Sequence, residues 1–156
     1  MKIYFKKVSN SQHELSILRD DGSSESTLVD TRNFLLHDLT HFAVESEANL
    51  QTGFWGLLAA GKTLADLNDR TGKSIQNETA DIMTIEAVVG VLHNLTRGSS
   101  ASEIVTNLRA QGKGLGWKIP TWLSEDFIES VHERLKKLLG HWRSTKFGEV
   151  MEFNWK

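Results

Sequence analysis

Hydrophobic and polar side chains alternate in short runs over the first 30 residues, with the two-residue period of β-strands. Lys2–Lys6 and His13–Arg19 predict two strands, and Ser26–Asp30 predicts a third, shorter one. The turn sequence Asp20-Asp21-Gly22 is a strong hairpin signal between the second and third strands. Residues 147–155 alternate in the same way, which predicts a closing strand that joins the N-terminal hairpin.

Between these strands the hydrophobic period changes to that of α-helices, beginning after Thr31, a candidate N-cap. Ser124 precedes two acidic residues, which is typical of a helix start. The glycines of Gln111–Trp117 predict a loop. The predicted helices cover residues of about 33–50, 54–69, 79–97, 101–111 and 124–143. The expected fold class is therefore α+β, a small antiparallel sheet packed against about five helices in a single domain, 1–156.

Composition narrows the possible functions. The chain has 156 residues, 24% of them charged, and a formal net charge of -2, without a basic cluster that could follow a phosphate backbone. We therefore expect no nucleic acid partner. The N-terminus turns polar at once and no apolar run approaches a membrane span, so we expect a cytoplasmic protein without membrane contact. The absence of cysteine excludes thiolate ligands, which leaves His, Asp and Glu to hold any metal.

The motif His37-Asp38-Leu39-Thr40-His41 lies on the predicted helix 33–50. Two histidines four residues apart project from one side of a helix and can bind one metal ion together, as in HExxH zinc proteins. Asp38 stands where those proteins carry a glutamate, so it is our candidate catalytic residue, either as base on a bound water or as a group that orients a ligand. The helix face that carries His37 and His41 also carries the hydrophobic residues Phe34 and Val44. This composition predicts that another element partly covers that face. The alternative interpretation is a solvated polar face.

A metal site needs at least one further ligand. Glu45 lies on the same helix but about 12 Å along its axis from His37, so all three could converge only if the helix bends. The predicted helix 79–97 offers Glu86 and His93, seven residues apart at the edge of its apolar stripe, although this edge could also be an ordinary polar one. The candidate ligands are therefore His37, His41, Glu45, Glu86 and His93. The expected cofactor is a divalent metal ion, most simply zinc.

The HDxxH motif of residues 37–41 resembles the zinc motif of the coenzyme Q biosynthesis (Coq) family, whose members are zinc-dependent and act on a quinone-precursor head group. That family places a glutamate about a dozen residues after the second histidine, where this chain has Gly53, and its helical fold differs from a chain that begins with strands. The segments 35–45 and 53–72 together are similar to small uncharacterised bacterial proteins. The resemblance implies a metal and no particular reaction.

Two functions follow from these patterns. The first is a metal-dependent hydrolase or lyase that acts on a small organic molecule. The second is a non-catalytic protein-interaction module, in which the sheet edges and the tryptophans of the C-terminal half contact a protein partner or form a homodimer. Those tryptophans are Trp117, Trp122, Trp142 and Trp155. Trp55 either walls a pocket beside the histidines or packs a corner between helices.

Overall fold

The computed structural model describes residues 1–68, 80–92, 98–116 and 119–156. The described residues form an α+β fold with a four-stranded antiparallel sheet and six helices, which confirms the predicted class. The strands are β1 (Lys2–Lys7), β2 (Gln12–Leu18), β3 (Ser24–Asp30) and β4 (Val150–Asn154). The helices are α1 (Thr31–Glu47), α2 (Phe54–Ala59), α3 (Leu64–Asn68), α4 (Ala80–Leu92), α5 (Ala101–Leu115) and α6 (Glu125–Ser144).

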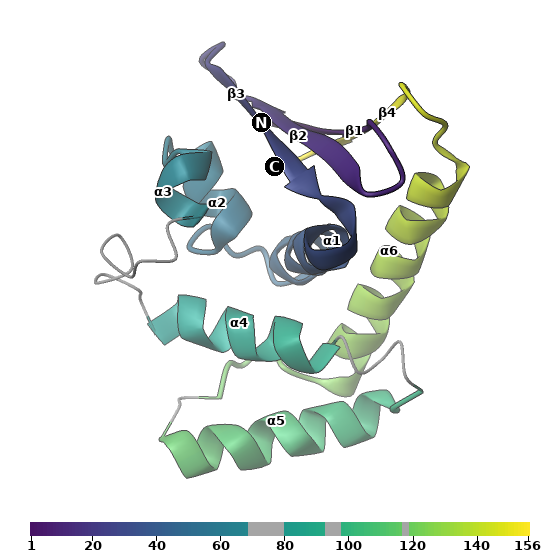
Figure 1. The fold of residues 1–156 in the computed structure, drawn as a ribbon. Helices are drawn as coiled ribbons and strands as arrows, with labels where there is room; N and C mark the ends of the chain where they lie inside the picture. Colours follow the sequence, from purple (N-terminus) through teal and green to yellow (C-terminus); the bar gives the residue numbers. More distant parts are fainter. Residues whose placement is uncertain (69–79, 93–97, 117–118) are drawn as a thin grey trace.

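The sheet has the strand order β3-β2-β1-β4 (Figure 1). The turn between β2 and β3 contains Gly22 at φ 85°, a left-handed conformation that glycine adopts at little cost. At the other edge, β4 pairs with β1 in antiparallel register, with Met151 opposite Phe5. Both of these side chains are fully buried. The predicted hairpin and the predicted closing strand are thus both present.

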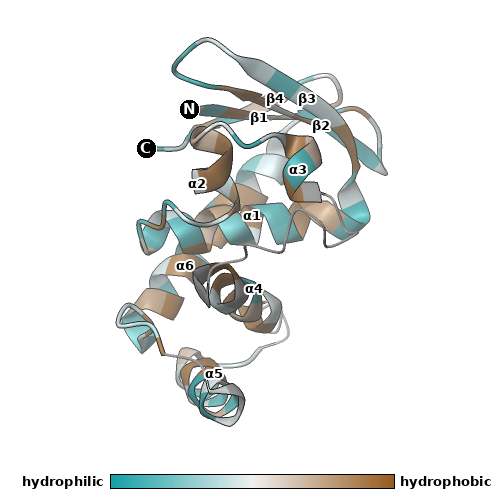
Figure 2. Ribbon diagram, turned by 90° about the vertical axis from the view of Figure 1, so that its left-hand side faces the viewer, coloured by the Kyte–Doolittle hydropathy of each residue, from teal (hydrophilic) through white to brown (hydrophobic). Residues whose placement is uncertain are grey.

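The helices lie on one side of the sheet in successive layers. Helix α1 lies nearest the middle of the molecule, α4 lies beyond it, and α5 forms the far layer, while α6 runs alongside (Figures 1 and 2). Helix α1 begins two residues before the predicted position, because the side chain of Asp30 accepts a hydrogen bond from the backbone N–H of Asn33 at 2.9 Å. Asp30 is therefore the N-cap, and the prediction of Thr31 at this position was wrong.

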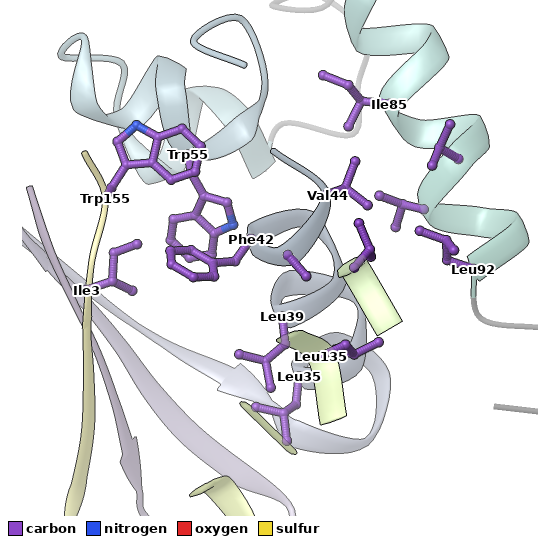
Figure 3. Packing of buried hydrophobic residues seen from close by; sticks show 14 of the residues in the cluster. Ile3, Leu35, Leu39, Phe42, Val44, Trp55, Ile85, Leu92, Leu135 and Trp155 are labelled. Carbon is purple, nitrogen blue, oxygen red and sulfur yellow. The ribbon is translucent and has the colours of Figure 1, made fainter. Parts of the chain in front are cut away.

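Helix α1 is buried on two sides. Leu39 and Phe42 point toward the sheet residue Ile3, whereas Val44 points toward Ile85 on α4 (Figure 3). All residues from Leu39 to Glu45 are buried. The face of α1 that carries His37 and His41, for which a solvated surface was one interpretation, is therefore partly enclosed by neighbouring helices.

The predicted single helix 54–69 was wrong, because the chain breaks into α2 and α3 at Gly61, which has φ 98°. The guanidinium group of Arg19 fixes this break by donating to the carbonyls of Leu58 and Lys62, each at 2.7 Å. The predicted loop 111–117 was also wrong over its first part: α5 continues through Leu115 and ends at Gly116 with φ 71°. None of the helices in the described ranges combines the length and the apolar character needed to cross a membrane.

Gly56 offers a test of the packing between α2 and the preceding loop. A Cβ atom at this position would lie 2.4 Å from the backbone carbonyl carbon of Gln51, so Gly56→Ala should destabilise the protein by about 1–3 kcal/mol. Gly140 is the matched control, because it lies in α6 and a Cβ atom added there would have nothing within 4 Å, so Gly140→Ala should stabilise by about 0.5–1 kcal/mol. Urea unfolding measures both changes, and equal effects would contradict this packing.

Candidate metal centre

The side chains of His37, His41 and Glu86 meet where α1 and α4 pack side by side. Each offers one ligand atom, and the three atoms lie within 4.8 Å of one another. The Nε2 atom of His41 is 3.2 Å from Oε1 of Glu86, and Nε2 of His37 is 3.7 Å from Oε2 of the same carboxylate. The structure thus brings one carboxylate from a second helix to the two histidines of the motif. This is a group that could hold a metal ion.

The other ring nitrogens face two further carboxylates. Nδ1 of His41 is 3.0 Å from Oε1 of Glu45, and Nδ1 of His37 is 3.5 Å from Oδ1 of Asp38. A carboxylate only accepts hydrogen bonds, so Nδ1 of each ring directs a proton at its carboxylate. Nε2 of each ring faces the carboxylate of Glu86, and loss of its proton would free this nitrogen for a metal ion. Carboxylates that hold histidine ligands in this way are typical of metal sites, where they fix the tautomer and the ring orientation.

Glu45 is fully buried, and its carboxylate is held by the start of α2. Oε1 accepts the backbone N–H of Phe54 at 3.0 Å, and Oε2 accepts that of Trp55 at 2.9 Å. Gly53 makes this approach possible, because a Cβ there would lie 2.3 Å from the Cδ atom of Glu45. Glu45 therefore supports His41 from behind and is not one of the three converging groups.

The three converging side chains differ in their exposure. The side chain of His41 is 4% exposed, that of His37 is 38% exposed and that of Glu86 is 51% exposed. The group is therefore buried on the His41 side and reaches solvent on the other. Three protein donors with an open side are typical of catalytic zinc sites, where a water molecule or a substrate takes the fourth position.

The charges of the cluster stabilise one another in the metal-free protein. Asp38, and after it Glu86, raises the pKa of His37 from 6.5 to about 9. Burial by itself would lower the pKa of His41, but its contacts with Glu45 and then Glu86 outweigh burial and raise it. The two histidines in turn hold the pKa of Glu86 well below its usual range. Protons and a metal ion would therefore compete for the same Nε2 atoms.

The stability of the metal-free protein should fall as the pH rises from about 6.5 to about 9. A histidine whose pKa is raised by folding contributes stability that is complete below its unfolded pKa of 6.5 and is lost as the pH passes the folded value, about 9 for His37. The pKa of His41 is shifted in the same direction. Thermal unfolding in the presence of a chelator measures this loss. A His37→Gln, His41→Gln double variant should show a flatter profile, and identical profiles for the two proteins would contradict the charge cluster.

The predicted site residues are distributed as follows. Asp38 lies on the Nδ1 side of His37, which favours the orienting role over that of a base for a bound water. His93 falls outside the described residues. Sequence reasoning missed that Gly53 and the backbone of Phe54 and Trp55 complete the site. The one available signal was the pair of glycines that flanks Phe54-Trp55, at 53 and 56.

The tryptophans are mostly part of the core. Trp55 is fully buried, lies near Phe5 and Phe42, and donates its indole N–H to the carbonyl of Asp38 at 3.3 Å, which agrees with the corner interpretation. Trp142 and Trp155 are also buried, so their side chains do not supply the interaction surface that the sequence suggested. Trp122 is partly buried against the core, and Trp117 lies outside the described residues.

Comparison of the chain with protein-family models, curated proteins and solved structures finds no match. The resemblance to the Coq zinc family therefore stays a prediction. The geometry of His37, His41 and Glu86 is the observation on which a function can be built.

Proposed function

We propose that the protein binds one divalent metal ion, most simply zinc, through His37, His41 and Glu86, and that the site serves a hydrolase or lyase reaction on a small organic molecule. The observation that carries the proposal is the convergence of one ring nitrogen from each histidine and one carboxylate oxygen of Glu86 within 4.8 Å of one another. Two imidazoles and a carboxylate form a common ligand set of catalytic zinc sites.

The surroundings of the three side chains support a metal rather than a chance cluster of charges. Each imidazole has a carboxylate on Nδ1, so both rings present Nε2 to the same point. Glu86 comes from α4 and the histidines from α1, so the ligand set is distributed over two packed helices. Such ligands keep their positions better than ligands on loops.

The chemistry follows from the open side of the site. A bound zinc ion would polarise a carbonyl group and lower the pKa of a coordinated water. Glu45 and Asp38 would accept the Nδ1 protons of the two imidazoles, which fixes the rings and turns Nε2 toward the ion. The exposed sides of His37 and Glu86 would border the space that a substrate enters. The buried side at His41 would exclude water from behind.

Metal analysis tests the proposal. Protein without a histidine tag is incubated with zinc, freed of excess ion by gel filtration, and analysed for bound metal. The parent should retain about one zinc ion per chain, and a His37→Ala, His41→Ala double variant should retain almost none. Zinc-dependent hydrolysis of a panel of small esters and amides should be lost in the same variant.

The matched control is the His132→Ala, His141→Ala double variant, which also removes two histidines but takes them from the exposed surface of α6. It should bind zinc as the parent does. A parent that retains no metal, or a first double variant that retains as much as the parent, would contradict the metal site.

A second candidate function is a non-catalytic interaction module. One observation favours it: Phe147 is 61% exposed, and Val8, which follows β1, and Val150, which begins β4, are each 46% exposed. The hydrogen bond from the N–H of Gly148 to the carbonyl of Lys7 brings these segments together. A parent that binds no zinc and elutes as a dimer in gel filtration, with a Phe147→Ser variant that elutes as a monomer, would favour this function.

A further inference from the structure

The start of α2 is joined to the candidate metal centre by one side chain. The backbone N–H groups of Phe54 and Trp55, the first two residues of α2, donate to the carboxylate of Glu45. The same carboxylate accepts the Nδ1 proton of His41. Oε1 is shared between Phe54 and His41, so a displacement of α2 moves the atom that orients the imidazole.

We propose that Glu45 is a positioning residue that couples the docking of α2 to metal binding, so that each strengthens the other. The inference rests on the proposed function, because it concerns the affinity of that site. Glu45 itself does not contact the metal. It fixes the ring of His41 and thereby the direction of Nε2.

Burial makes this coupling strong. The side chain of Glu45 is 0% exposed and that of His41 is 4% exposed, so water cannot replace the hydrogen bonds between Glu45, His41 and α2 if one partner moves. A rotated His41 ring would leave its Nδ1–H without the Glu45 carboxylate as a partner in the interior, and the carboxylate would lose one of its three donors. The ring is therefore held in one orientation for as long as α2 stays docked.

A substitution at Gly53 tests the coupling independently of any change to Glu45 itself. The backbone of Gly53, at φ -85° and ψ -174°, is extended, so alanine can adopt this conformation without strain. The added Cβ would nevertheless lie 2.3 Å from the Cδ atom of Glu45 and force the carboxylate to move. Gly53→Ala thus displaces Glu45 without changing any charged group, whereas Glu45→Gln removes the charge and keeps the size of the side chain.

Coupling between two events is reciprocal. If docking of α2 strengthens zinc binding, then zinc binding must strengthen the docking of α2 by the same factor. The hydrogen bonds that open when α2 undocks are those of the Phe54 and Trp55 amides to Glu45. Zinc should therefore slow hydrogen exchange at these two amides in the parent protein.

The experiment measures zinc affinity by competition with a chromophoric chelator for the parent, Glu45→Gln and Gly53→Ala. Both variants should bind about 10–100-fold more weakly than the parent. Leu108→Ala is the control for general destabilisation, because Leu108 is 1% exposed on α5, on the far side of α4 from α1. It should lower Tm and leave the zinc affinity of the folded protein unchanged.

The outcomes separate this inference from the function on which it rests. A parent that binds no zinc overturns both. A parent that binds zinc, with Glu45→Gln and Gly53→Ala equal to it in affinity, overturns the coupling alone. If neither variant folds, hydrogen exchange of the parent decides: slowing at Phe54 and Trp55 that exceeds the slowing across α5 supports the coupling, and equal slowing at both places overturns it.

Discussion

Replacing Glu86 by glutamine should weaken zinc binding by more than about 100-fold, or about 2.7 kcal/mol. Glu86 is the only one of the three converging groups that comes from α4. Changes to groups that only orient a ligand already cost about 10–100-fold in affinity, and loss of a charged ligand should cost more. Glutamine keeps the shape of the side chain but removes the negative charge, so the fold should be retained. Isothermal titration with zinc measures the change.

Glu129→Gln is the matched control for this substitution. Glu129 is an exposed carboxylate on α6, so its replacement removes the same charge from the protein without approaching the histidines. Zinc affinity should then equal that of the parent. A Glu86→Gln variant that binds as tightly as the Glu129→Gln variant would show that Glu86 does not bind the metal.

Zinc at about 1,000 times its dissociation constant should raise Tm by about 8–16 °C. Binding to the folded state alone at this concentration stabilises it by about 4 kcal/mol. A chain of this length gains about 2–4 °C in Tm for each kcal/mol. The ion would join α1 to α4 in place of the direct contacts of Glu86 with the two histidines, and in addition to side-chain packing such as that of Val44 against Ile85. Differential scanning calorimetry measures the shift, and addition of a chelator should reverse it.

The His41→Ala variant provides the comparison for this shift in Tm. We choose His41 because its side chain is the most deeply buried of the three candidate ligands His37, His41 and Glu86. The Tm of the variant itself should be lower than that of the parent, and zinc should raise it by less than about 2 °C. A zinc-induced rise of equal size in this variant and the parent would mean that the ion stabilises the protein from another place.

The sequence carried enough information to predict the fold class and to place all three converging groups among five candidate ligands, but it did not single out Glu86 from Glu45 and His93. Alternation in the terminal segments predicted the strands, and the i, i+4 spacing placed His37 and His41 on one side of a helix. The helical period also predicted that Glu86 lies at the edge of a core-facing stripe. In the structure the Glu86 edge of α4 lies against α1, because Val44 and Ile85 pack between the two helices. The hydrophobic pattern of α4 alone does not specify which element it packs against.

The role of Glu45 could not be predicted in the same way. On a straight helix Glu45 lies too far from His37 for both to bind the same metal ion. The sequence was therefore compatible with either a bent helix or a different role for Glu45. The structure gives it a different role, which depends on a loop that folds back so that Gly53, Phe54 and Trp55 reach its carboxylate. Such contacts between side chain and backbone have no periodic signature. The break at Gly61 was missed for a similar reason, since Arg19, just after β2 and far away in the sequence, helps to fix it.

The tautomers of His37 and His41 provide the most direct test of the metal site. Long-range ¹H–¹⁵N NMR spectra of the histidine rings distinguish a protonated, a free and a metal-bound nitrogen. On addition of one equivalent of zinc, the Nε2 signals of both rings should change to the metal-bound form, while both Nδ1 atoms keep their protons because Asp38 and Glu45 accept them. Ring signals that stay unchanged with zinc, or zinc bound through Nδ1, would contradict the proposed site.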